Sequence, residues 1–315
     1  MTDLVAAARL LWCRGLAQTR GRPSKSIQEW LSTATFAPSL SNKDIFLTGV
    51  DEKELLAALA FDINRLSMAA CETLRNISEI QEVPKSMGWP YVKLYYAALF
   101  YCHTLLRIWG KSTNYLRTTD LILLRSTINA YGLSSPFTLS TGQYLIVADI
   151  DNTQAVLSQD RGGGGSHDAV WRELSKAFST LKIALSNSQL LQVDKARLQS
   201  QIDQAQNLLS SNGSNPAWLS FMRNDINYKQ AEGVWYPYKG RARTSELSNL
   251  VTQAMSETTD YNQFLISSGS DLVRFRSGCL FLISFARAVI RDLSKTGGNK
   301  SFIRFGQAQF ENAFP

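Results

Sequence analysis

The chain has 315 residues, 44% hydrophobic and 19% charged, a composition typical of a globular protein and not of a disordered one. Its net charge of +7 favours a polyanionic partner, most often nucleic acid, over an acidic protein substrate. The four cysteines lie far apart and form no CxxC pair, so the sequence predicts no metal site and no cofactor, and it favours a reduced, cytoplasmic protein.

The N-terminus is expected to form an amphipathic helix and not a signal peptide, because it lacks a basic segment and carries Asp3. The longest apolar runs, residues 94–106 and 279–286, are shorter than the roughly 20 residues that cross a bilayer. We therefore expect no membrane association. Residues 1–50 are interpreted as a helical extension, residues 51–295 as a helical bundle, and residues 296–315 as a loosely packed tail.

Two long helices are predicted at the start of the bundle. Asp51 is a capping residue for a helix over 51–80, in which apolar residues recur at steps of three and four: Leu55, Leu59, Ile63, Leu66, Ala70, Leu74 and Ile77. A second helix begins at Trp89 and Pro90 and ends at Gly110. Because it is apolar on nearly all sides, we expect it at the centre of the bundle.

The middle of the chain changes character. Residues 111–135 are predicted to continue helically, and a small irregular or β-hairpin insertion is expected around residues 141–142. The glycine run at 161–166 is interpreted as a linker that ends where a helix begins, at Ser166 or Asp168. Further helices are predicted over residues 169–185, 190–209, 246–255 and 272–293.

Residues 216–238 carry the main candidate site. The spacing of Arg223, Asn224, Asn227 and Tyr228 is expected to bring them together at a helix end. Arginine beside Asn and Tyr is typical of anion or nucleotide recognition. A buried network that ties a loop to the core remains an equally open interpretation.

Basic and aromatic residues interleave directly afterwards, a combination that stacks bases while charge follows a nucleic-acid backbone. The candidates for nucleic-acid binding are Lys229, Trp235, Tyr236, Lys239, Arg241 and Arg243. Alternatively, these aromatics close the end of the bundle and the cations are solvated. Of the two histidines, His167 is a further functional candidate, whereas His103 is expected to be a hydrogen-bonded core residue.

Two stretches resemble HEPN domains, compact helical bundles of prokaryotic toxin–antitoxin, CRISPR-associated and anti-phage systems. Residues 92–110, VKLYYAALFYCHTLLRIWG, resemble the YYA-type second helix of that family. Residues 222–230, MRNDINYKQ, resemble its motif of an arginine and a polar residue that precede a histidine by four to six positions. The likeness covers residues 51–110 and 217–292, with 111–215 as a large insertion, and it implies a mainly α, HEPN-like bundle.

The resemblance implies a metal-independent ribonuclease in which Arg223 binds the scissile phosphate and Asn224 and Asn227 orient it. Tyr228 stands where the histidine could fall. Tyrosine, with an ordinary pKa of about 10, is a poor base at neutral pH. Enzymatic activity is therefore left open.

Two hypotheses follow from the resemblance. The first is an RNA-directed effector, either a ribonuclease or an RNA-binding toxin, of a prokaryotic defence or toxin–antitoxin system. The second is a non-catalytic HEPN-like scaffold, sensor or antitoxin-partner subunit of a defence complex. The expected partners are RNA, a protein from the same operon, and a second copy of the chain, because HEPN-type sites usually form across a dimer.

Overall fold

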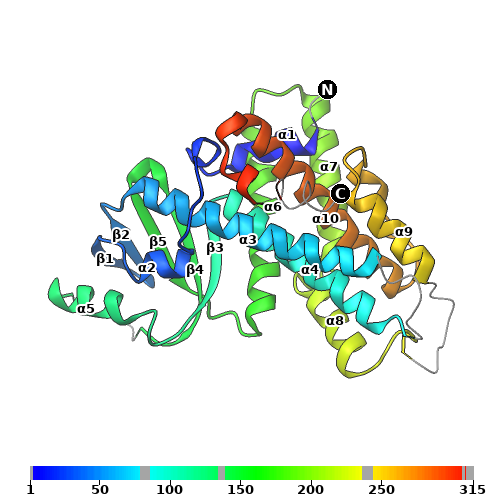
Figure 1. Ribbon diagram of the computed structural model, residues 1–315, viewed down its shortest axis with the longest axis horizontal. Coiled ribbons are helices and arrows are strands. Elements are labelled where there is room, and N and C mark those ends of the chain that lie inside the picture. The colour runs from blue at the N-terminus through cyan, green and yellow to red at the C-terminus, as the bar shows by residue number, and fades with distance from the viewer. Residues whose placement is uncertain (1–2, 79–85, 134–138, 236–243, 307–308, 310–315) are drawn as a thin grey trace. The chain divides into compact units, whose positions relative to one another are not determined.

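The computed structural model describes residues 3–78, 86–133, 139–235, 244–306 and 309. These residues are mainly helical and include a small five-stranded antiparallel sheet, which confirms the fold class in its coarse form (Figure 1). The chain divides into two compact units, each built from three segments. Unit 1 comprises Met1–Leu10, Leu66–Cys102 and Trp171–Asp292, and unit 2 comprises Leu11–Arg65, His103–Val170 and Leu293–Pro315.

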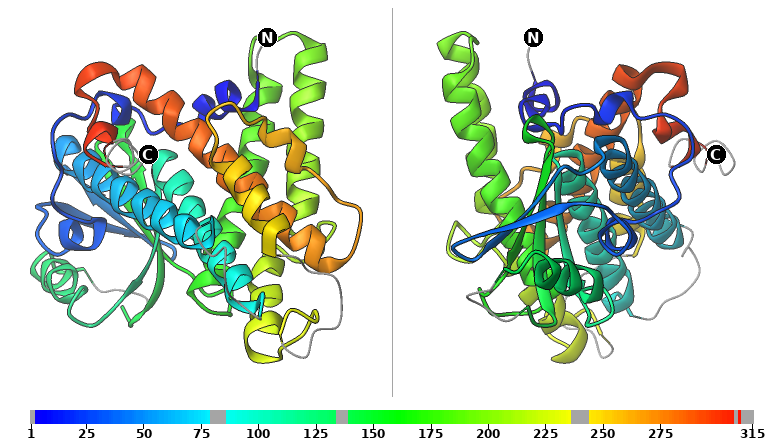
Figure 2. Two further views of the ribbon diagram at one scale, coloured as in Figure 1. Left: turned by 45° about the vertical axis from the view of Figure 1, so that its right-hand side comes forward. Right: turned by 90° about the vertical axis from the view of Figure 1, so that its left-hand side faces the viewer.

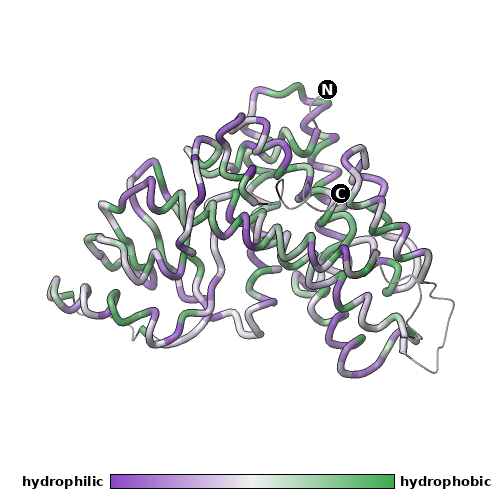
Figure 3. Tube along the Cα trace, viewed as in Figure 1, coloured by the Kyte–Doolittle hydropathy of each residue, from purple (hydrophilic) through white to green (hydrophobic). Residues whose placement is uncertain are grey.

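The described part of unit 1 contains helices and no strand. The α-helices that lie wholly or partly within this unit are α1 (Leu4–Ala8), α3 (Glu52–Ser78), α4 (Gly88–Ile108), α6 (Ser166–Asn187), α7 (Gln192–Leu209), α8 (Trp218–Tyr228), α9 (Thr244–Met255) and α10 (Asp271–Gly297). Hydrophobic residues recur along α4 and α10 (Figure 3). In the core, Phe281 and Phe285 of α10 stack with ring centroids 5.8 Å apart, and Phe178 of α6 packs against Phe285.

Unit 2 holds the sheet. Its strands are β1 (Ala37–Ser41), β2 (Asp44–Thr48), β3 (Lys111–Leu116), β4 (Gly142–Asp149) and β5 (Gln154–Gln159), in the order β1-β2-β5-β4-β3. Figure 1 labels the strands, and Figure 2 shows the sheet from two further sides. Two short helices accompany it, α2 (Ile27–Leu31) and α5 (Ile122–Ala130). Ile45, Leu47, Ile146 and Leu157 are buried, as expected where one face of an antiparallel sheet packs on a core.

The two long helices predicted at the start of the bundle are confirmed as α3 and α4. The carboxylate of Asp51 accepts hydrogen bonds from the backbone N–H groups of Lys53 and Glu54, at 2.8 and 3.2 Å, and so caps α3. The later helices are confirmed as α6, α7, α9 and α10, and α6 begins at Ser166 as expected.

The prediction that residues 111–135 continue helically is wrong for their first part. Gly110 has a φ of +71°, which ends the run of α4, and residues 111–116 then form β3. β3 pairs along its whole length with β4, from Lys111 opposite Val147 to Leu116 opposite Gly142. Helical structure returns only in α5. The hairpin is real, but its turn lies at residues 150–153, between β4 and β5, and not at 141–142.

Both ends of the chain also differ from expectation. Residues 37–48, assigned to a helical extension, form the β1–β2 hairpin, and β2 continues the sheet by pairing with β5. The tail is not loosely packed at its start, because Ser301, Phe302 and Ile303 are buried. Ser301 forms a β-bridge with Arg20, and the Asn64 amide donates to the Phe302 carbonyl at 3.0 Å.

Candidate nucleic-acid interface

The two sides of α8 differ in chemistry. Leu219, Met222 and Ile226 recur at steps of three and four and are buried, the pattern of a helix that packs one side on a core. Phe221 and Tyr228 lie on the opposite side and are 49% and 73% exposed. Asn224, half-buried, falls between them in the helical repeat. We call Phe221, Asn224 and Tyr228 the aromatic face of α8.

Arg223 belongs to the buried side of α8. Arg223 is 8% exposed, and its guanidinium carbon lies 5.2 Å from the ring centroid of Tyr95 and 5.6 Å from that of Tyr96. Both tyrosines come from α4. A guanidinium over aromatic rings at these distances forms cation–π interactions. Arg223 therefore joins α8 to α4 within unit 1.

Tyr95 is held at the centre of this contact. The Trp171 indole donates a hydrogen bond to its hydroxyl at 3.0 Å, and its ring stacks on Phe275 with centroids 6.4 Å apart. Burial raises the pKa of Tyr95 to about 12, although hydrogen bonds with Trp171 and Ser220 and the charge of Arg223 act in the opposite direction. The phenol therefore keeps its proton at neutral pH and cannot act there as a general base.

The predicted cluster is divided between the two sides of α8. Residues five positions apart on a helix point about 140° away from each other, so Arg223 and Tyr228 face different environments. Asn227 is half-buried, and Lys229, just after the helix, forms an ion pair with Asp225 at 2.7 Å. The structure therefore joins Arg223 to two tyrosines that the site prediction did not include, and leaves Tyr228 exposed.

Trp235 packs at the C-terminal end of α8. Its indole N–H donates to the Ile226 carbonyl at 2.6 Å, and its ring lies edge-on to Trp89 with centroids 5.6 Å apart. A Cβ atom added at Gly88 would lie 2.1 Å from this ring, so only glycine fits there. Trp235 has a structural role, and Trp89, 57% exposed, is the ring of this pair that a ligand can reach.

The other predicted residues fall elsewhere. Tyr236, Lys239, Arg241 and Arg243 lie outside the described residues. His167 belongs to unit 2, on the first turn of α6; burial, the Arg107 guanidinium and, to a smaller extent, His167 lower the pKa of His103. Within the described ranges no group of three or more His, Cys, Asp or Glu residues is arranged to hold a metal ion, and no helix is long and apolar enough to cross a membrane.

Comparisons of this chain with protein-family models, with curated proteins and with solved structures give no match.

Two features of the interface escaped sequence reasoning. Phe221 was not proposed, although it stands seven positions before Tyr228 and off the apolar repeat of its helix, a spacing that places both rings on one side. The contact of Arg223 with Tyr95 and Tyr96 joins residues more than a hundred positions apart, and no local pattern signals it.

Proposed function

We propose that this chain is an RNA-directed effector of HEPN-like architecture that binds single-stranded RNA on the aromatic face of α8 without cleaving it. The observation that carries the proposal is the pair of exposed rings, Phe221 and Tyr228, on one side of a helix whose other side is anchored in the core. Every base has a flat π surface, so exposed rings bind single strands with little sequence preference.

Neighbouring groups support this proposal. Trp89 is exposed and packs on Trp235, which is hydrogen-bonded to Ile226 of α8. Trp89 therefore adds a third accessible ring to the same region of unit 1. Lys229 follows the helix with 72% of its side chain exposed and provides a cation for a phosphate. The net charge of +7 favours association with a polyanion over long distances.

Binding without cleavage is favoured by the state of the acid–base groups. Cleavage needs a group that accepts a proton near neutral pH. The sequence has Tyr228 where the related motif has histidine, and burial holds the pKa of Tyr95 at about 12. Arg223, the group that would steady the phosphate, is buried over tyrosine rings.

The proposal is tested by fluorescence anisotropy with labelled oligouridine. Replacing both Phe221 and Tyr228 with alanine should remove stacking worth about 1–3 kcal/mol per base, a loss of at least tenfold in affinity. The matched control is the double variant of Tyr115 and Tyr131, which are 55% and 56% exposed in unit 2. An equal loss of RNA affinity in the two double variants would contradict the proposal, because the aromatic face would then contribute no more than other exposed rings.

A metal-independent ribonuclease is the second candidate. It is favoured by one observation: residues 222–230 resemble the HEPN arginine motif, with Arg223 and Asn224 in the places of its arginine and its polar neighbour. Incubation of the protein with tRNA and mixed RNA in chelator distinguishes the candidates. We expect the RNA to stay intact; cleavage that disappears in Arg223→Lys would establish the enzyme instead.

A further inference from the structure

A cavity of about 520 Å³ lies within unit 2, between α2, α3 and the turn that follows β3. This volume is in the range of sites that bind small molecules. Its walls mix polar and apolar surface and carry charges of both signs, from Glu29, Arg65, Arg117 and Asp120, while Phe61 contributes a half-buried ring. None of these residues belongs to the interface on α8.

Two arginines supply the positive charge of the cavity. The Arg65 side chain is 47% exposed and donates from Nε to the Asp62 carboxylate at 2.7 Å. Across the described ranges, the terminal nitrogens of Arg65 and the guanidinium of Arg117 make no protein hydrogen bond or ion pair. Both groups therefore keep donors for a ligand, in the forked geometry that suits a phosphate.

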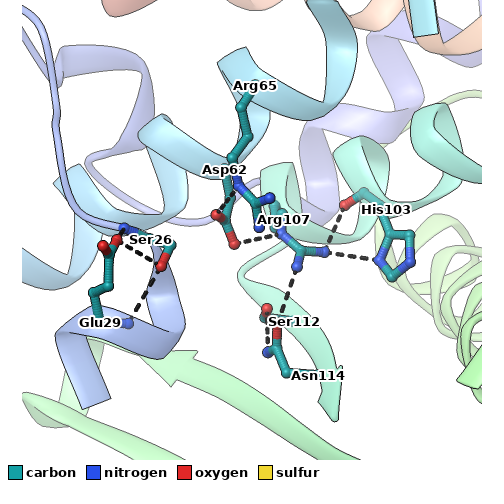
Figure 4. A network of polar contacts seen from close by, with 8 residues as sticks. All are labelled: Ser26, Glu29, Asp62, Arg65, His103, Arg107, Ser112 and Asn114. Carbon is teal, nitrogen blue, oxygen red and sulfur yellow. Dashed lines mark hydrogen bonds and ion pairs between the residues drawn. The ribbon is translucent and has the colours of Figure 1, made fainter. Parts of the chain in front are cut away.

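A buried network holds Arg65 in place (Figure 4). Asp62 is fully buried and shares its two carboxylate oxygens between Arg65 and Arg107, whose Nε donates at 2.9 Å. Arg107 is 2% exposed and also donates to His103 Nδ1 at 3.0 Å and to Asn114 Oδ1 at 3.3 Å. Burying such charges costs free energy even when they are paired. Through Asp62 the network restrains the Arg65 guanidinium at the cavity wall.

The carboxylates of the cavity keep acceptors for hydroxyl groups. Ser26 donates from its backbone and its hydroxyl to Oε2 of Glu29, at 2.6 and 2.8 Å, which leaves Oε1 for a ligand. These hydrogen bonds lower the pKa of Glu29, so it is ionised at neutral pH. Asp120 similarly accepts from the Arg117 backbone with Oδ2, at 2.7 Å, and keeps Oδ1.

The hydroxyl side chains that line the cavity add further acceptors. The Ser32 hydroxyl donates a hydrogen bond to the Gln28 carbonyl and the Thr33 hydroxyl donates one to the Glu29 carbonyl, both at 3.0 Å. Their oxygens therefore accept hydrogen bonds and cannot bind an anion. A ligand that satisfies the cavity must carry both a strongly negative group and several hydroxyl donors.

We infer that this cavity binds a small phosphorylated sugar, with its phosphate between Arg65 and Arg117 and its hydroxyl groups on Glu29 and Asp120. Phe61 offers a flat apolar surface to the carbon skeleton of the sugar or to an attached base. A free sugar phosphate and a nucleotide share this chemistry. The inference does not depend on RNA binding at α8.

Isothermal titration calorimetry with ribose 5-phosphate, AMP and inorganic phosphate tests the inference. Ribose 5-phosphate should bind, and Arg117→Gln should weaken it roughly 10- to 100-fold, because a charge-assisted hydrogen bond is lost. Arg304→Gln, at an exposed arginine of unit 2 outside the cavity, is the matched control and should leave binding unchanged. Glu29→Gln should weaken ribose 5-phosphate, whereas inorganic phosphate should bind as tightly as before or more tightly, because a negative charge beside the anion is removed.

Comparison of the three ligands distinguishes a nucleotide from a free sugar phosphate and shows when the inference is wrong. Binding of AMP at least as tight as that of ribose 5-phosphate identifies a nucleotide, and exclusion of AMP identifies a free sugar phosphate. Inorganic phosphate binding as tightly as ribose 5-phosphate would overturn the inference, since hydroxyl recognition would then contribute nothing. Absence of all binding, or binding unaffected by Arg117→Gln, would also overturn it.

Discussion

Arg223 shows how one residue can be recognised from sequence while its environment stays undecided. Its type and its polar neighbours were visible in the motif, and they left two interpretations open. In the structure Arg223 is buried over Tyr95 and Tyr96, which agrees with the interpretation of a buried network and not with that of an open ligand site. The partners come from a helix distant in sequence, and so the choice depended on tertiary packing.

The first prediction concerns Arg223. Arg223→Ala should lower the free energy of unfolding by about 2 kcal/mol, because the cation–π contacts and the packing of the aliphatic stem are both lost. At temperatures where the variant stays folded, its RNA affinity should match that of the wild type. Urea unfolding and anisotropy measure the two quantities. Unchanged stability together with lost RNA binding would assign Arg223 to the ligand site.

The second prediction concerns His103. Burial, the Arg107 guanidinium and the charges of His167 and Arg65 lower its pKa well below the ordinary value. The unfolded chain therefore takes up a proton near pH 6.5 that the folded protein does not, and stability falls below that pH by up to about 1.4 kcal/mol per pH unit. In His103→Asn, whose amide oxygen can accept from Arg107, this loss should shrink. An identical pH profile of urea unfolding in both proteins would refute the assignment.

At the scale of elements, the long helices and a hairpin in the middle of the chain were predictable, whereas β1, β2 and β3 were not. α3 and α10 carry apolar residues at helical spacing over 27 residues each, so their faces are defined locally. β3 has no such signal: residues 111–116 form a strand because β4 pairs with them. β1 and β2 likewise depend on β5, which lies more than a hundred residues further along the chain.

The third prediction tests the junction of α4 and α8. Alanine normally stabilises a helix by about 1 kcal/mol relative to glycine. Gly88→Ala should instead destabilise unit 1 by about 1–3 kcal/mol, because its Cβ would overlap the Trp235 ring. Gly278→Ala in α10, whose Cβ would meet its nearest neighbour at an ordinary 3.5 Å, is the matched control and should be neutral or stabilising. Equal stability of the two variants in urea would show that Trp235 does not pack on Gly88.

At the scale of the whole molecule, the mainly helical fold expected from the periodicity of apolar residues is confirmed, and the HEPN-like assignment and the RNA partner stay predictions. The two units interleave along the chain, with segments of each separated by segments of the other. The cavity of unit 2 also depends on segments that are far apart in the sequence, because its walls come from residues 26–33, 61–65 and 117–120.

The fourth prediction concerns the salt dependence of RNA binding by this positively charged molecule. If Lys229 contacts a phosphate, RNA affinity should fall with salt, and Lys229→Gln should reduce the slope of log K against log salt by about 0.7, the value for one contact to a single strand. The ion pair with Asp225 would be exchanged for the phosphate on binding. A slope identical to that of the wild type would remove Lys229 from the interface.

The most direct test of RNA binding on α8 is photochemical crosslinking. RNA containing 4-thiouridine is irradiated in complex with the full chain, and the attached residues are identified by mass spectrometry. The account predicts crosslinks at Phe221, Tyr228 and Trp89, the exposed rings at and beside the aromatic face. Crosslinks confined to unit 2, with these three rings unmodified, would contradict it.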